Sequence, residues 1–128
     1  MRKKVLATVM ALGISMGVGL IAAQARPSKR FDAATKTCRL LTFKNLEDGY
    51  HLFENSCKSC HHRGNAQGAE FLYSESTTMK GWTRVFATRY PECAKDGVWN
   101  KLSQDQLLKI NDYLYAYAWD ASDPHCFV

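Results

Sequence analysis

Residues 57 to 62 of this chain read CKSCHH and bring two thiols and two imidazoles within six positions. Cys57 and Cys60 are three residues apart, so on one turn of helix their side chains face the same way. His61 directly follows the second cysteine. Groups of this kind can hold a zinc ion, form a redox-active pair or attach a haem. The rest of the sequence has to decide between these chemistries.

The pattern C-x-x-C-H formed by Cys57, Cys60 and His61 is typical of covalent haem attachment. Two thiols on one helical turn can add to the two vinyl groups on one edge of a porphyrin, and the adjacent imidazole can bind the iron. Covalent bonds also retain the cofactor in a dilute compartment. We therefore expect one haem c, attached through Cys57 and Cys60, with His61 as the proximal iron ligand.

The alternatives to haem find less support in the sequence. A structural zinc site needs a closed set of four ligands, and no second C-x-x-C or H-x-x-x-H follows at a usual spacing. A thioredoxin-type pair would lie near a βαβ pattern, and no strand-rich run adjoins the motif. A plain disulfide between Cys57 and Cys60 is the remaining alternative. No further C-x-x-C-H occurs, so a multihaem protein is excluded.

The N-terminus indicates the compartment. Residues 2–4 are basic, residues 5–22 form an almost uninterrupted apolar run, and residues 23–25 read Ala-Gln-Ala, a typical cleavage site. These features predict a signal peptide at residues 1–25 and a periplasmic protein that is soluble after cleavage. The alternative is an uncleaved membrane anchor, since the apolar run is close to the length of a span. Contact with a membrane is otherwise expected to be transient.

The chain without its leader is small and nearly neutral. Cleavage after Ala25 leaves 103 residues, which suits one domain. Without Arg2, Lys3 and Lys4 the chain has 14 Lys and Arg against 12 Asp and Glu, so the net charge falls from +5 to +2. A nucleic-acid-binding domain would keep a clustered basic surface. We therefore set nucleic acid aside as a partner and expect a monomer.

Five cysteines cannot all pair in disulfides. With Cys57 and Cys60 assigned to haem, Cys38, Cys93 and Cys126 can form one disulfide and leave one thiol. We favour a pair between Cys93 and Cys126, because these residues flank the last predicted helix and a disulfide would join its two ends. Cys38 with Cys126 is nearly as good. Alternatively, Cys93 supplies a thiolate ligand to the haem, which would indicate sulfur redox chemistry.

The residues before the motif predict a helix from about Leu46 into the haem motif. Asn45 can cap it, and the apolar spacing continues to Cys57. Gly49 and Phe53 complete the pattern G-x-x-x-F-x-x-x-C-x-x-C-H, which resembles the N-terminal helix of class I cytochromes c. In that family the glycine allows another helix to approach closely, and the aromatic residue packs at the crossing.

A second helix is predicted near the C-terminus. Residues 103–106 read SQDQ, which has the form of a capping box, and an apolar stripe with helical spacing follows. Ile110, Tyr113 and Leu114 resemble the pattern by which the last helix of the family crosses the first. The resemblance implies an all-α, cytochrome c-like fold whose N- and C-terminal helices cross over a covalently bound haem. It places the cytochrome c domain at residues 45–128, after a polar N-terminal extension at 26–44.

The middle of the chain is unlike the common members of the family. Residues 78–90 predict a third helix that ends before Pro91. The family usually has a proline after the motif, whose carbonyl orients the proximal histidine, but no proline lies between His61 and Tyr90. Another backbone carbonyl is therefore expected to orient His61. We describe the chain as similar to a divergent class I cytochrome.

The distal iron ligand is predicted to be Met79. After cleavage Met79 is the only methionine, and it lies between the haem motif and the last helix, the order that the family uses. The competing histidines are less well placed: His62 adjoins the proximal residue, His51 lies on the incoming helix, and His125 is near the C-terminus. A thioether ligand implies a higher reduction potential than two histidines.

These features predict an electron carrier, not an enzyme, in which electrons pass through the exposed haem edge to redox partner proteins that the sequence does not identify. The alternative is a haem protein with an open or thiolate-ligated distal site that binds gas or takes part in sulfur redox chemistry. Class I carriers commonly surround the haem edge with basic residues that attract acidic partners. The candidates here are Lys58, Arg63, Lys80 and Arg84, although they are also compatible with an ordinary solvated surface.

Overall fold

The computed structural model describes residues 26–121. The predicted signal peptide, His125 and Cys126 lie outside these residues. The elements in chain order are β1 (Lys29–Asp32), β2 (Thr37–Leu40), α1 (Phe43–Leu52), the π-helix η1 (Phe53–Cys57), the 3₁₀-helix η2 (Ser74–Ser76), α2 (Met79–Thr88), α3 (Glu92–Lys95), the 3₁₀-helix η3 (Val98–Lys101) and α4 (Gln104–Ala116). The described part is a small, mainly helical fold, as the sequence predicts at this level. None of its helices is long and apolar enough to cross a membrane.

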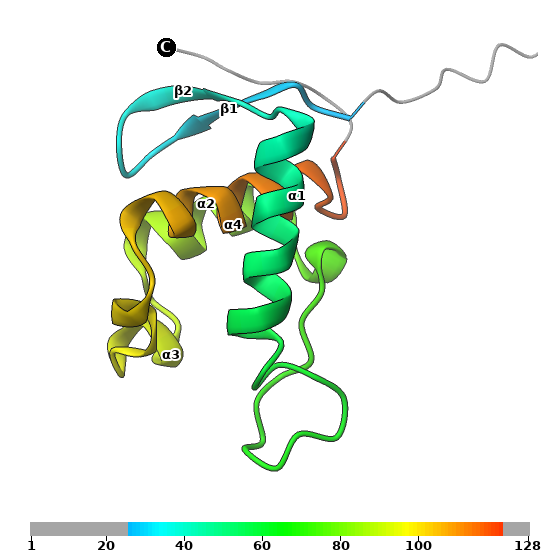
Figure 1. Ribbon diagram of the computed structural model, residues 1–128, viewed down its shortest axis with the longest axis vertical. Helices are drawn as coiled ribbons and strands as arrows, with labels where there is room; N and C mark the ends of the chain where they lie inside the picture. Colours follow the sequence, from blue (N-terminus) through cyan, green and yellow to red (C-terminus); the bar gives the residue numbers. More distant parts are fainter. Residues whose placement is uncertain (1–25, 122–128) are drawn as a thin grey trace, which may run out of the picture.

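Helices α1 and α4 cross and hold the fold together (Figure 1). Gly49 lies at the crossing, where an added Cβ would overlap the Lys109 carbonyl and approach Tyr113 Cβ to 2.9 Å. The Tyr113 ring contacts Tyr50 edge-on at 5.5 Å between centroids and Phe53 at 5.9 Å. The predicted roles of the glycine and the aromatic residues at a helix crossing are therefore confirmed.

The helix ends show which capping predictions hold. Ser103 caps α4 and forms the predicted capping box with Gln106. Helix α2 begins after Thr78, whose side chain accepts from Gly81 N, close to the predicted start. Helix α1, however, begins three residues before the predicted Leu46, because Thr42 caps it and accepts a 3.3 Å hydrogen bond from Asn45 N. Asn45 was therefore the wrong cap.

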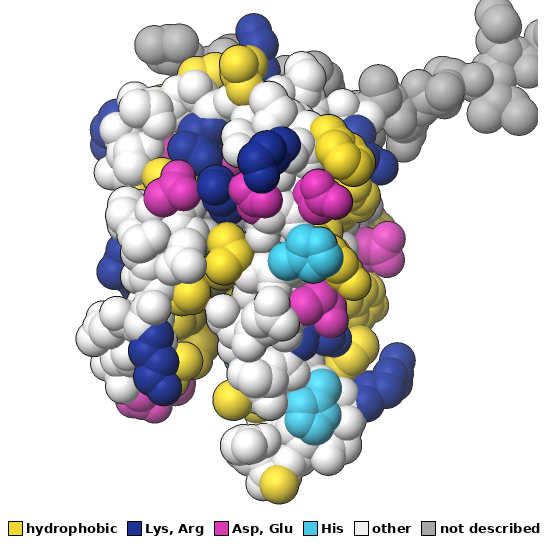
Figure 2. All heavy atoms as spheres, viewed as in Figure 1, with side chains coloured by type: hydrophobic (Ala, Val, Ile, Leu, Met, Phe, Trp, Pro, Cys, Tyr) yellow, Lys and Arg dark blue, Asp and Glu magenta, His cyan; other side chains and the backbone are white. Residues whose placement is uncertain are grey.

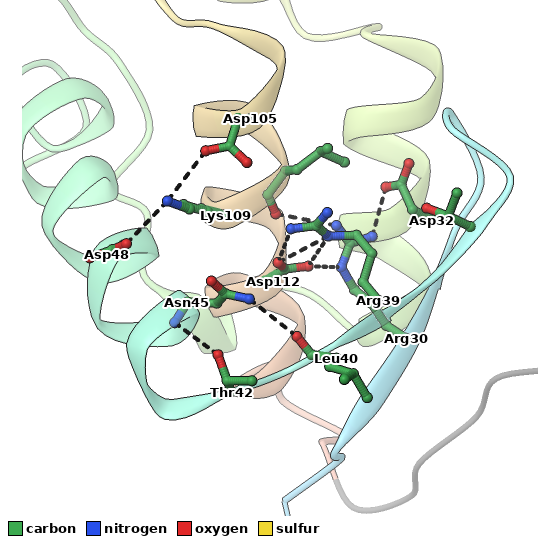
Figure 3. A network of polar contacts seen from close by, with 12 residues as sticks. Arg30, Asp32, Arg39, Leu40, Thr42, Asn45, Asp48, Asp105, Lys109 and Asp112 are labelled. Carbon is green, nitrogen blue, oxygen red and sulfur yellow. Dashed lines mark hydrogen bonds and ion pairs between the residues drawn. The ribbon is translucent and has the colours of Figure 1, made fainter.

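The polar segment 26–44 contains an antiparallel hairpin of β1 and β2, seen at the top of Figure 1. It is fixed to α4 by a buried charge network (Figure 3). The fully buried Asp112 carboxylate of α4 accepts from Arg30 Nε at 2.6 Å and from Arg39 Nη2 at 2.6 Å. Arg30, itself fully buried, also donates to Asp32 at 2.8 Å and to the Leu108 carbonyl at 3.2 Å. This segment is thus part of the folded unit.

The apolar core lies between α1, α2 and α4. Ile110 and Leu114 of α4 are almost completely buried, as the predicted stripe requires, and they share one hydrophobic cluster with Phe53 and Trp82. The core fills only one end of the fold. Beyond it, α3 and η3 lie on one side and the loop after the haem motif on the other (Figure 1).

Candidate haem-binding site

The haem motif begins at the end of η1, where the helix changes from α to π geometry. Lys58 N donates to Phe53 O at 3.0 Å, a bond between residues five apart. The chain then turns, and His61 N donates to Cys57 O at 2.9 Å. Such local widening is frequent at functional sites. The π-helix places Cys57 next to the core, and Phe53 remains buried against Tyr113 of α4.

A cavity adjoins the motif and has two parts, of about 430 and 280 Å³. The larger part lies between residues 55–61 and the α3–η3 segment, and the smaller part extends to α2 and α4. Figure 2 shows a notch between the two lower lobes of the molecule with hydrophobic side chains along it. The apolar side chains of the cavity are Phe53, Leu72, Trp82, Val85, Phe86, Val98, Trp99, Leu102 and Leu114.

Both motif cysteines and His61 line this cavity. Cys57 and His61 border both of its parts, whereas Cys60 borders the larger one. Burial, and then the nearby thiols of Cys93 and Cys60, raise the pKa of Cys57 to about 12. The Cys57 thiol is therefore neutral at physiological pH and lies in apolar surroundings, next to the space that a cofactor would fill.

The imidazole of His61 is oriented by a backbone carbonyl. His61 Nδ1 lies 2.7 Å from the Glu70 carbonyl oxygen, so the ring donates from Nδ1 and carries its lone pair on Nε2. This is the arrangement that a metal-binding histidine needs. The expectation that a backbone carbonyl orients the His61 ring is therefore confirmed, and that carbonyl belongs to Glu70.

The loop between His61 and Leu72 holds Glu70 in place. The Asn65 side chain donates to His62 O at 2.9 Å and to Ala69 O at 2.7 Å, and it accepts from Ala69 N at 2.8 Å. Leu72 N closes the loop by donating to His61 O at 3.2 Å. Three bonds from one asparagine thus fix the residue beside Glu70.

Met79 does not lie with the motif. It is the first residue of α2, it is 9% exposed, and it belongs to the hydrophobic core cluster. Its backbone N–H donates to Asp120 Oδ1 at 2.6 Å. Met79 lines neither part of the cavity. The structure therefore brings Cys57, Cys60 and His61 to one cavity, whereas Met79 lies in the core cluster against which Cys57 packs.

Cys93 lies at the cavity. From the sequence, this residue was only an alternative candidate for a haem ligand. It is on α3, its thiol is free, and it lines both parts of the cavity. The favoured disulfide between Cys93 and Cys126 was therefore wrong. Cys38 on the hairpin is the disulfide-bonded residue instead. The sequence offered one indication of this position: Cys93 lies in the connection between the predicted helix at 78–90 and the last predicted helix.

The remaining predicted residues surround the site less closely. His51 and His62 are exposed and line neither part of the cavity. Lys58 is half-buried, donates to Leu72 O at 2.9 Å and lies 4.1 Å from the Phe71 ring centroid. Arg63 lies over the same ring at 4.6 Å. Two of the four basic residues thus gather around the Phe71 ring.

The cavity and the donor groups that line it are compatible with a bound haem. Within residues 26–121, no three Cys, His, Asp or Glu side chains converge closely enough to hold a metal ion. A haem needs no such convergence, because its thioether bonds are on the porphyrin edge and only the axial groups reach the iron. The larger part of the cavity alone is within the roughly 300–1,000 Å³ typical of cofactor sites.

None of the known family models, curated proteins or solved structures matches this chain significantly.

Proposed function

We propose that the protein is an exported c-type cytochrome with one haem, attached to Cys57 and Cys60, that carries electrons between redox partner proteins. One observation supports this function most strongly. The two thiols and the imidazole of a C-x-x-C-H motif line one apolar cavity, and His61 is hydrogen-bonded through Nδ1 so that Nε2 is left to bind iron.

The chain contributes attachment, orientation and exclusion of water. Cys57 and Cys60 would hold the haem through thioether bonds: each thiol would add across a vinyl double bond, with sulfur on one carbon and the thiol hydrogen on the other, and without net oxidation or reduction. The Glu70 carbonyl keeps the His61 ring in one orientation and increases its donor strength. Trp82, Phe86 and Leu114 supply an apolar wall. The bound haem would supply a one-electron couple whose potential depends on its axial ligands.

Crossed terminal helices also support a cytochrome c-like arrangement. The Gly49–Lys109 contact and the Phe53–Tyr113 contact are what the resemblance to class I cytochromes implies for the two helices that frame the haem. Leu114 of α4 lines the cavity, so this crossing is continuous with the site.

The test is to express the full chain in a host with a c-type haem attachment system and to purify the exported protein. We expect the intact mass to include one haem, a Soret absorption band, and a reversible one-electron couple. Cys57→Ala and Cys60→Ala should each leave one thioether bond, and the double variant none. A control, Cys93→Ala, should keep both bonds. Export of a soluble protein without haem, or with one zinc ion per chain, would overturn the proposal.

A further inference from the structure

The cavity restricts which side chain can bind the iron opposite His61. Side chains that can bind haem iron include histidine, methionine, tyrosine, the thiolate of cysteine and the neutral amine of lysine. Among the described residues that line the cavity, His61 is the only histidine, there is no methionine, and two of the three cysteines are the attachment cysteines. Cys93, Tyr90 and Lys101 are left.

Cys93 is better placed than Tyr90 or Lys101. Four residues border both parts of the cavity: Cys57, His61, Cys93 and Trp99. Cys93 therefore lies where the two parts meet, as His61 does. Tyr90 borders only the smaller part, is 49% exposed, and has its ring under Arg84 at 5.3 Å. Lys101 borders only the larger part and is exposed.

Cys93 is also separate from the motif in the chain, so it can approach a haem from another side. His61 lies in the turn that follows η1, whereas Cys93 lies on α3, two residues after Pro91. Figure 1 shows α3 and the loop after the motif on opposite sides of the lower end of the molecule. Trp99 stacks on Phe86 at 4.9 Å and links the α3–η3 segment to α2, which fixes the wall that carries Cys93.

We propose that the Cys93 thiolate, and not Met79, is the distal axial ligand of the haem. This inference rests on the proposed function. On binding, the thiol loses its proton to solvent and sulfur donates a lone pair to the iron, with no change in oxidation state. An anionic sulfur donor stabilises ferric iron, so the couple is more reducing than one with a thioether ligand. The two ligands thus distinguish a carrier for low-potential partners from one for high-potential partners.

The experiment compares the full haem-loaded chain with three variants by absorption and electron paramagnetic resonance. The wild type should be low-spin in the ferric state and should lack the band near 695 nm that methionine ligation gives in the family. Cys93→Ala should become high-spin and bind carbon monoxide readily after reduction, and its reduction potential should rise. Cys93→Met should restore a low-spin spectrum with the 695 nm band.

Met79→Leu is the matched control, because a swap of similar volume in the core preserves packing. Its spectrum and potential should equal those of the wild type.

Alkylation offers a second measurement: a ligated Cys93 should react with iodoacetamide at least tenfold more slowly than the same residue in the unfolded protein. A low-spin Cys93→Ala protein, or loss of the ligand in Met79→Leu, would overturn the inference. Absence of haem from all variants would instead count against the proposed function.

Discussion

Arg30 and Asp112 lie 82 residues apart in the sequence, yet their fully buried side chains form an ion pair of 2.6 Å between Nε and Oδ1. The two groups come from the hairpin and from α4. Burial of charges is costly unless each group is paired and hydrogen-bonded. Arg30 meets this condition through bonds to Asp112, Asp32 and the Leu108 carbonyl.

Asp112→Asn should therefore destabilise the protein strongly, since it removes the charge that balances Arg30. We expect the free energy of unfolding in urea to fall by about 3–5 kcal/mol. The control is Asp105→Asn on the exposed face of the same helix. This variant should change the free energy of unfolding little. Equal decreases in the free energy of unfolding for the two variants would show that the buried ion pair stabilises the fold no more than an exposed one.

The same network predicts an acid-sensitive stability. Burial would raise the pKa of Asp32, but hydrogen bonds from Arg30 and Thr35 outweigh it and lower the pKa below 3.8. A lowered folded pKa stabilises the protein fully above the unfolded value and progressively less as the pH falls through the folded value. The melting temperature should thus decrease below about pH 3.8. Asp32→Asn should flatten this decrease, and an identical pH profile in the variant would contradict the assignment.

Gly49→Ala tests the crossing of α1 and α4. The new Cβ would overlap the Lys109 carbonyl, and we expect a loss of about 1–3 kcal/mol in unfolding free energy from overpacking. In a helix without close neighbours, Gly→Ala would instead raise the free energy of unfolding by up to about 1 kcal/mol. A decrease in this free energy, measured by urea unfolding, would therefore support the close helix crossing, and an increase would contradict it. Glu47→Ala, at an exposed position of α1, is the control and should have little effect.

The disulfide of Cys38 can be located by peptide mapping of the non-reduced protein. Cys57, Cys60 and Cys93 are free, so by elimination we expect a cross-linked peptide that joins Cys38 to Cys126. Cys38→Ser should lower the free energy of unfolding by about 2–5 kcal/mol, because the unfolded chain loses a constraint. A Cys93-containing cross-link would contradict this pairing and also remove the proposed haem ligand.

Basic residues near the cavity predict a salt-dependent reaction with acidic partners. Electrostatic attraction raises association rates and is screened by salt. The rate at which a small acidic redox protein reduces the haem-loaded chain should fall as ionic strength rises, and Arg63→Gln should weaken this dependence. A rate that is flat from low to high salt would remove the docking hypothesis. Arg26→Gln is the control, because the Arg26 guanidinium lies over the Tyr117 ring at the end of α4, whereas Arg63 lies over Phe71 in the loop after the motif.

Local signals predicted the helices well, and long-range contacts explain the differences. The capping box at Ser103 and the stripe through Ile110 and Leu114 depend on residues a few positions apart, so the sequence displays them. The start of α1 was displaced because Thr42 and Asn45 are both good caps, and local propensity does not choose between them. The predicted C-x-x-C-H chemistry depends only on adjacent residues, and all three lie at one cavity.

The hairpin and Cys93 were harder to predict for the same physical reason. The hairpin connection at residues 33–36 has no Gly, Pro, Asn or Asp, and Lys36 takes a positive φ of 57° without any such signal. From the sequence alone, Arg30 is expected on the surface, because its buried partner Asp112 is distant in the chain. Cys93 likewise becomes a cavity residue only when α3 is positioned opposite the motif. Neither environment is encoded within one segment.

The crossing of early and late segments has a consequence for the order in which the chain folds. Arg30 needs Asp112, and Asp48 pairs with Lys109 across 61 residues, so the N-terminal elements cannot complete their contacts until α4 is present. Under the proposed function, a chain exported N-terminus first would present Cys57 and Cys60 well before residue 112 arrives. During that interval the two thiols would lie in a segment that has not completed its contacts with α4 and would be accessible to haem attachment.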